Sequence, residues 1–110
     1  MKHIMEGTNK QTTLTDDFEL LSNTEKAKKL VKYILEDAET FVERRALMAE
    51  VKRLNKKLSL YTIEKAIYEL ELEGELVVKK SGKTRYYMLR EIYEKKRAEE
   101  LAKEADELTQ

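Results

Sequence analysis

Residues 59–90 decide the fold, and they read SLYTIEKAIYELELEGELVVKKSGKTRYYMLR. The apolar residues of the first half recur at helical spacing as far as one glycine, which predicts a helix with a single buried face. Those residues are Ile63, Ala66, Ile67 and Leu70. Ser59 can cap the start of this helix. Gly74 can end it, because glycine readily adopts the left-handed conformation found just past helix ends.

The pattern changes after Gly74. Two short β-prone runs, residues 76–78 and 86–89, are joined by a polar segment that contains Gly82. Apolar and aromatic runs separated by a glycine-containing turn are typical of a β-hairpin, and Gly82 can supply a positive φ at the turn. The stretch therefore predicts a helix, a sharp stop and a hairpin with lysines at its tip.

A first helix is expected well before this stretch. Residues 22–25 read SNTE, the Ser-x-x-Glu form of a capping box, which predicts a helix start. The apolar residues behind it share one helical face. They are Ala27, Leu30, Val31, Ile34, Leu35 and Ala38.

A second helix is expected over roughly residues 42–55, and its start allows two interpretations. Residues 40–43, TFVE, repeat the Thr-x-x-Glu pattern and could cap this helix. Alternatively, Phe41 and Val42 form a short strand that leads into it. The apolar stripe of the second helix consists of Leu47, Met48, Val51 and Leu54.

The two ends of the chain differ from the middle. Residues 1–23 are polar and are expected to form an arm, whereas residues 91–110 contain no helix breaker and predict an added C-terminal helix. Its apolar stripe is thin and has the width of a two-helix seam, which favours a homodimer held through this helix. The alternative is a monomer whose C-terminal helix is solvated and frayed or packed on itself, because the stripe is interrupted and rich in alanine. The stripe consists of Ala98, Leu101, Ala105 and Leu108.

Composition narrows the class of protein. The chain has 110 residues, enough for one domain, with 41% hydrophobic and 40% charged residues. It has no cysteine, which excludes disulfides and thiolate metal sites. The start lacks the apolar run of a signal peptide and no segment could span a bilayer, so we expect a cytoplasmic protein without membrane partners. The absence of proline and the abundance of Lys and Glu are typical of proteins from hot environments.

Catalysis and cofactors find no support in the sequence. No glycine-rich phosphate loop, nucleophile motif or ligand-spaced carboxylate set is present. The single histidine, His3, lies in the N-terminal arm without a partner nearby in sequence, and Asp16-Asp17 reads as a turn or helix start. We therefore expect a protein that is not an enzyme and needs no cofactor and no metal.

The order of elements resembles the winged helix-turn-helix family of DNA-binding domains, of the kind found in prokaryotic and archaeal transcription regulators. The detailed match is in the third helix and its stop, at Thr62-Ile63, Ala66-Ile67, Leu70-Glu71 and Glu73-Gly74, followed by the hairpin with TRYYML. The resemblance covers about residues 24–90 and implies an α+β, mostly helical fold with a three-helix core and a two-stranded β-hairpin wing. It also implies sequence-specific binding to double-stranded DNA by a transcriptional regulator that acts by occupying its site.

The distribution of charge agrees with an anionic partner for the middle of the chain. Residues 24–90 hold sixteen Lys or Arg and eleven Asp or Glu, a net charge of +5, while residues 1–23 carry −2 and residues 91–110 carry −3. On the third helix, Tyr61, Lys65 and Tyr68 project opposite the apolar face, where a helix lying in a major groove would meet base edges. Lys52 and Arg53 extend the basic cluster of the preceding turn.

The expected DNA-binding residues come from this helix, the turn before it and the hairpin, where cations can meet the phosphates on both sides of a groove. They are Lys56, Lys57, Ser59, Tyr61, Thr62, Lys65, Tyr68, Lys79, Lys80, Lys83 and Arg85.

Two other interpretations stay open. Four glutamates of the third helix would repel phosphate, which favours a winged-helix module that binds another protein without binding DNA. They are Glu64, Glu69, Glu71 and Glu73. Tyr61 and Tyr68 could also be half-buried against the hairpin or a partner. The second alternative to DNA binding is an RNA-binding domain.

Overall fold

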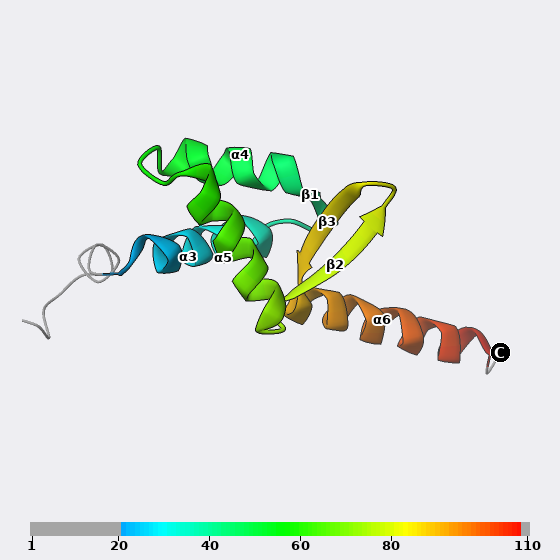
Figure 1. The fold of residues 1–110 in the computed structure, drawn as a ribbon. Coiled ribbons are helices and arrows are strands. Elements are labelled where there is room, and N and C mark those ends of the chain that lie inside the picture. The colour runs from blue at the N-terminus through cyan, green and yellow to red at the C-terminus, as the bar shows by residue number, and fades with distance from the viewer. Residues whose placement is uncertain (1–20, 109–110) are drawn as a thin grey trace, which may run out of the picture.

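The computed structural model describes residues 21–108, and 65% of these lie in helices (Figure 1). Residues 1–20 of the expected arm, which include His3, lie outside the described residues. The described part has four helices and one three-stranded antiparallel sheet, which confirms the mostly helical α+β architecture. Its elements are α3 (Asn23–Glu36), β1 (Val42–Glu43), α4 (Arg44–Leu54), α5 (Leu60–Leu72), β2 (Leu76–Ser81), β3 (Thr84–Leu89) and α6 (Arg90–Leu108).

Local capping sets the ends of α3 and α5. The Ser22 hydroxyl accepts a hydrogen bond from the Glu25 N–H at 3.1 Å, and the Ser59 hydroxyl accepts one from the Thr62 N–H at 3.0 Å. Gly74, with φ +80°, ends α5, and the N–H groups of residues 74 and 75 return to carbonyls of the last turn. This is a Schellman motif, which satisfies carbonyls that a helix end leaves unpaired. All three predicted signals are confirmed.

The start of α4 decides between the two interpretations of residues 40–43. Val42 and Glu43 pair with Tyr87 and Tyr86 of β3, so they are held extended as a short edge strand. The helix therefore begins at Arg44, with Glu43 as an N-cap that makes no side-chain hydrogen bond. The short-strand interpretation is confirmed one residue later than expected, and the helix cap at residues 40–43 is wrong.

The hairpin is longer than predicted. β2 and β3 pair from Leu76↔Leu89 to Ser81↔Thr84, which leaves only Gly82 and Lys83 in the turn. Gly82 has φ +63° and no other residue of this turn has a positive φ. Glycine at the first central position is the requirement of a type II′ hairpin turn. Consequently Lys79 and Lys80 belong to a strand, and only Lys83 lies at the tip.

The core lies where α3, α4 and α5 meet one face of the sheet. Its buried side chains include Ala27, Val31, Leu35, Leu47, Val51, Leu58, Ile63, Ala66, Ile67, Leu70, Leu76, Tyr87 and Leu89. The buried face predicted for α5 is confirmed residue by residue, and Leu54 of α4, which was expected in the stripe, is 40% exposed. Leu58 was not foreseen: it lies in the turn between α4 and α5 and is 1% exposed.

A lysine fixes that turn. The Lys52 ammonium donates hydrogen bonds to the backbone carbonyls of Lys56 at 2.9 Å and Leu58 at 2.5 Å. It thereby satisfies two backbone carbonyls of the turn that follows α4. Lys52 therefore ties the turn between α4 and α5 to the last part of α4.

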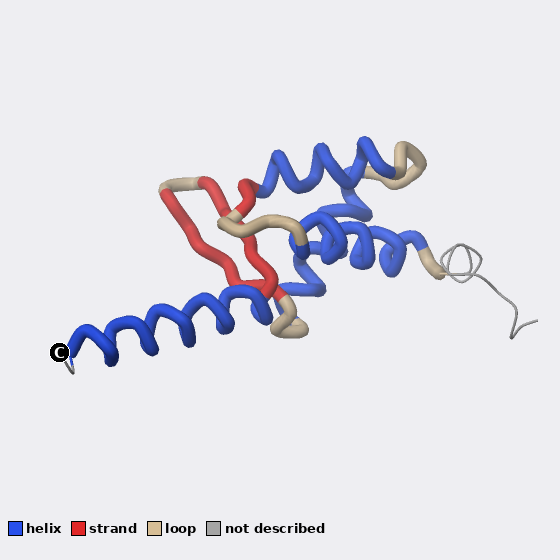
Figure 2. Tube along the Cα trace, turned by 180° about the vertical axis from the view of Figure 1, so that it is seen from behind, coloured by secondary structure: helices blue, strands red, loops and turns tan. Residues whose placement is uncertain are grey.

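The C-terminal helix α6 starts at the end of β3 and runs away from the body, as Figure 2 shows from behind. Its root is attached: Tyr93 meets Phe41 edge-to-face with ring centroids 6.1 Å apart, and the Arg90 Nε donates to the Gly74 carbonyl at 2.6 Å. None of its residues is fully buried. Among residues 21–108, no helix has the length and hydropathy needed to cross a membrane.

Candidate nucleic-acid interface

Helix α5 has one buried and one exposed face. Opposite the core residues lie Tyr61, 72% exposed, Tyr68, 56% exposed, and the exposed Lys65 between them. The helical phase predicted from sequence is therefore confirmed, and the two tyrosines are not buried against the hairpin. Leu72 continues the same stripe and is 67% exposed.

A groove of about 480 Å³ runs beside this stripe, between α5, the start of α4 and β3. Tyr61, Lys65 and Tyr68 line it from α5, and Arg44 and Arg85 line it from the other two elements. The exposed face of α5 is thus bordered by two arginines that come from distant parts of the sequence.

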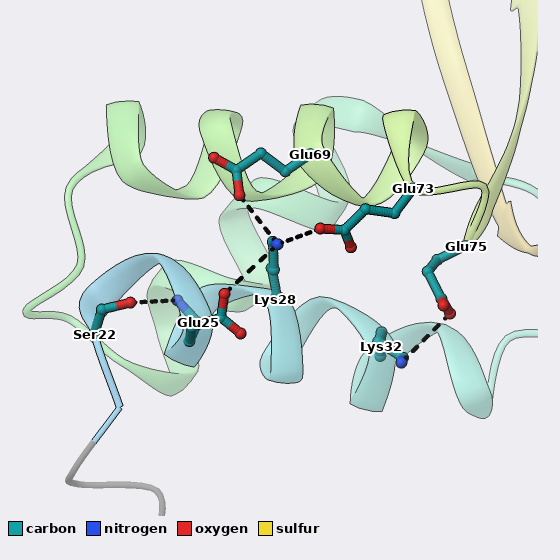
Figure 3. A network of polar contacts seen from close by, with 7 residues as sticks. All are labelled: Ser22, Glu25, Lys28, Lys32, Glu69, Glu73 and Glu75. Carbon is teal, nitrogen blue, oxygen red and sulfur yellow. Dashed lines mark hydrogen bonds and ion pairs between the residues drawn. The ribbon is translucent and has the colours of Figure 1, made fainter.

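The two glutamates that face α3 are paired with one lysine. The Lys28 ammonium lies 2.7 Å from a Glu73 oxygen, 3.0 Å from Glu69 and 3.6 Å from Glu25, as Figure 3 shows. Lys28 is buried, and the hydrogen bonds to Glu73 and Glu69 raise its pKa well above the ordinary value. Glu69 and Glu73 therefore point away from the exposed stripe and carry a compensated charge.

The two glutamates on the other flank are paired with the arginines of the groove. Glu64 forms an ion pair with Arg44, and Glu71 lies 3.5 Å from the Arg85 guanidinium. All four glutamates that argued against an anionic partner are thus matched by a cation within the chain. The negative charge of α5 is reduced on both sides of its exposed face.

The turn before α5 presents two lysines. Lys56 and Lys57 are exposed and form no ion pair with any residue between 21 and 108. The other two basic residues of this region are engaged, because Lys52 binds backbone carbonyls and the Arg53 guanidinium forms two hydrogen bonds to Glu50, at 2.5 and 3.0 Å. The Arg53 guanidinium lowers the pKa of Glu50.

The hairpin divides its cations between two faces. Side chains alternate along a strand, so the cross-strand neighbours Lys80 and Arg85 lie on the face that carries the buried Tyr87 and turns toward α5. Lys79 lies on the opposite face, where its ammonium is 5.7 Å from the centre of the Phe41 ring. The structure therefore groups Lys80 and Arg85 with α5, places Lys83 at the tip and separates Lys79 from them.

Ser59 and Thr62 are occupied by the helix cap. The Ser59 hydroxyl accepts from the Thr62 N–H and donates to the Thr62 hydroxyl at 2.9 Å. Both residues were expected to bind DNA, and in the structure their hydroxyl groups are hydrogen-bonded to each other within the cap. Their observed role is to start α5 at the right position.

Sequence reasoning missed two arginines near the hairpin tip. Arg44 and the exposed Arg45 begin α4 and line a hollow of about 290 Å³ together with Lys83 and Arg85. A sequence signal for these two arginines did exist: they occupy the first turn of a helix, where the helix dipole disfavours cations. Because two arginines at that position reduce helix stability, their presence there indicates a role other than stabilising the helix.

The described residues hold no group of three or more His, Cys, Asp or Glu side chains that could bind a metal ion. Comparison of the chain with protein-family models, with curated proteins and with solved structures finds no match.

Proposed function

We propose that this chain is a winged helix-turn-helix protein that binds double-stranded DNA and regulates transcription by occupying its site. Helix α5 is the recognition helix and the β2–β3 hairpin is the wing. The element order and the antiparallel pairing of a short strand after α3 with the hairpin support this assignment. The regulator acts in the cytoplasm and needs no cofactor.

One observation carries the proposal. The exposed face of α5 holds Tyr61, Lys65 and Tyr68, and cations without a described partner border it at the turn and at the hairpin. A helix of this width fits the major groove of B-DNA, which is roughly 12 Å wide. The turn and the wing then lie over the two phosphate walls of that groove.

The residues divide into two roles. Tyr61, Lys65 and Tyr68 meet base edges and sugars, and they set the sequence preference. Four lysines, which we call the interface lysines, neutralise phosphates and supply affinity for any sequence. The interface lysines are Lys56, Lys57, Lys80 and Lys83.

A second candidate function is a winged-helix module that binds another protein. It is favoured by large apolar side chains exposed on α5, since Leu60 at the start of the helix is 56% exposed and Leu72, on the exposed stripe, is 67% exposed. Titration of the protein with mixed-sequence duplex DNA in low salt separates the two functions. Retardation of the DNA supports the proposal, and its absence at high protein concentration favours the protein-binding module.

Replacement of the readout residues tests the role of α5. We expect Lys65→Ala or Tyr68→Ala to weaken binding to the preferred site by about 1–3 kcal/mol, the usual cost of a lost base contact. Binding to random duplex should change much less, because the phosphate contacts remain. Fluorescence anisotropy with both DNAs measures the difference. Thermal unfolding should match the wild type, since both side chains are exposed; a variant that unfolds would refute the assigned face.

The proposal includes a homodimer formed through α6. Ala98, Leu101, Ala105 and Leu108 are all exposed and recur at the three- and four-residue spacing of a two-helix seam. Four small or medium side chains bury far less than the roughly 800 Å² per partner of a standard interface. The dimer is therefore weak alone and is stabilised when two copies bind adjacent half-sites, spaced about 34 Å apart.

Sedimentation with and without DNA tests the dimer. We expect the full chain to associate at tens of micromolar, which is on the order of the affinity of a small interface, and Leu101→Lys to remain monomeric. This substitution spares Ile92 and Tyr93, which attach α6 to the body. Lys103→Leu, on a neighbouring exposed position, is the control and should not abolish association. A full-length protein that stays monomeric even on DNA would contradict the dimer.

A further inference from the structure

Two neighbouring hollows on the surface have lining residues in common. The groove beside α5 and the smaller hollow at the hairpin tip are both lined by Arg44 and Arg85. The smaller hollow also has Arg45 and Lys83 on its rim, so cations from α4, the hairpin turn and β3 converge there. Any ligand that extends from the exposed face of α5 toward the hairpin tip passes these four residues.

The four cations differ in their partners. Arg44 and Arg85 form ion pairs with Glu64 and Glu71 of α5, whereas Arg45 and Lys83 form no ion pair with a residue between 21 and 108. Glu43 is the only carboxylate that lines the hollow itself. The hollow therefore carries an excess of positive charge that the fold does not compensate.

The pairing of Arg85 is incomplete. The Glu71 oxygen that lies 3.5 Å from its guanidinium is nearly inaccessible to solvent and accepts no hydrogen bond. Arg85 is therefore held at this oxygen by charge attraction and not by a hydrogen bond, and that attraction is lost when the guanidinium moves to another anion, which lowers the affinity for that anion. The side chains of Arg44 and Arg85 are 38% and 40% exposed, so both can turn toward a ligand.

We infer that the hollow at the hairpin tip is a phosphate-binding subsite for the DNA backbone, in which Arg44 and Arg85 leave Glu64 and Glu71 when DNA binds. Arg45 and Lys83 bind the phosphate directly, and the two paired arginines join them. Glu64 and Glu71 are positioning residues: they hold the arginines in the free protein and lower the affinity for every duplex. The inference rests on the proposed function, because it assigns a phosphate to a surface that DNA must reach.

The inference predicts that removing either carboxylate strengthens DNA binding. We expect Glu71→Gln and Glu64→Gln each to tighten binding to random duplex about two- to fivefold, the range that exposed ion pairs contribute. Glu36→Gln, which removes the same charge from an exposed position at the end of α3, should change the affinity much less. Arg45→Ala should weaken binding about eightfold near 0.1 M salt and reduce the salt dependence by roughly one phosphate contact.

A double-mutant cycle separates release of the arginine from simple charge repulsion. In an Arg85→Gln background, Glu71→Gln should give no gain beyond that of Glu36→Gln, because there is no arginine to release. An equal gain in both backgrounds, no gain in either, or an unchanged affinity of Arg45→Ala would overturn the inference and leave the proposed function standing. A wild-type protein that binds no duplex DNA would overturn both.

Discussion

Alanine replacement of all four interface lysines is expected to weaken binding to any duplex DNA by on the order of 10³-fold near 0.1 M salt. The residues are Lys56, Lys57, Lys80 and Lys83. Each phosphate contact contributes a salt dependence of about 0.9 log units per tenfold change in salt, so the slope should fall by roughly 3.6. Anisotropy titrations at several salt concentrations measure both quantities.

A charge-matched control exists within the chain. Lys29 on α3 and three lysines of α6 are also without ion pairs to described residues, but they lie on elements away from the exposed face of α5. The α6 lysines are Lys95, Lys96 and Lys103. Alanine at these four positions removes the same net charge and should change the affinity far less. Equal losses in the two quadruple variants would show that net charge alone, and not the proposed interface, attracts the DNA.

Lys28→Met is expected to lower the free energy of unfolding by about 2–3 kcal/mol. Removing one partner of a fully buried ion pair costs about 3–5 kcal/mol, and the carboxylates here are partly in water, which reduces the loss. Methionine preserves the apolar stem, so the change isolates the ammonium group. Lys29→Met, one residue along and exposed, should stay within about 0.5 kcal/mol of wild type in a urea melt.

The same cluster predicts how stability changes at alkaline pH. The hydrogen bonds to Glu73 and Glu69 raise the pKa of Lys28 in the folded protein above its unfolded value of about 10.4. The folded state then binds the proton more tightly, so this stabilisation is fully present below about pH 10.4 and declines as the pH rises beyond it. As the pH rises above about 10.4, the free energy of unfolding should fall more for the wild-type protein than for Lys28→Met. Parallel alkaline profiles of the two proteins would contradict a stabilising Lys28 cluster.

The sequence could predict the features that depend on local chemistry. Ser22, Ser59 and Gly74 mark helix ends because their effect acts within one turn of the chain. The buried face of α5 follows from apolar residues at helical spacing, and the same period places Tyr61 and Tyr68 on the exposed side.

The features that were missed depend on contacts between distant segments or on residues outside any period. Leu58 is a single apolar residue in a turn, so no periodicity marked it as core. Lys28 meets Glu73 across 45 positions of sequence, and neither residue type predicts that contact. Lys79 and Lys80 lie on opposite faces because β2 extends to Ser81 and side chains alternate along a strand. Predicting this would have required knowing that the strand continues past residue 78.

The most direct test of the central claim is selection of bound fragments from a pool of random duplex DNA by the full-length protein. The proposal predicts that duplex is retained in low salt and that successive rounds enrich one sequence, whose affinity falls on Lys65→Ala or Tyr68→Ala substitution. It also predicts that binding declines steeply as salt rises. A protein that retains no duplex in low salt would contradict DNA binding, and one that retains duplex without enriching any sequence would contradict readout by α5.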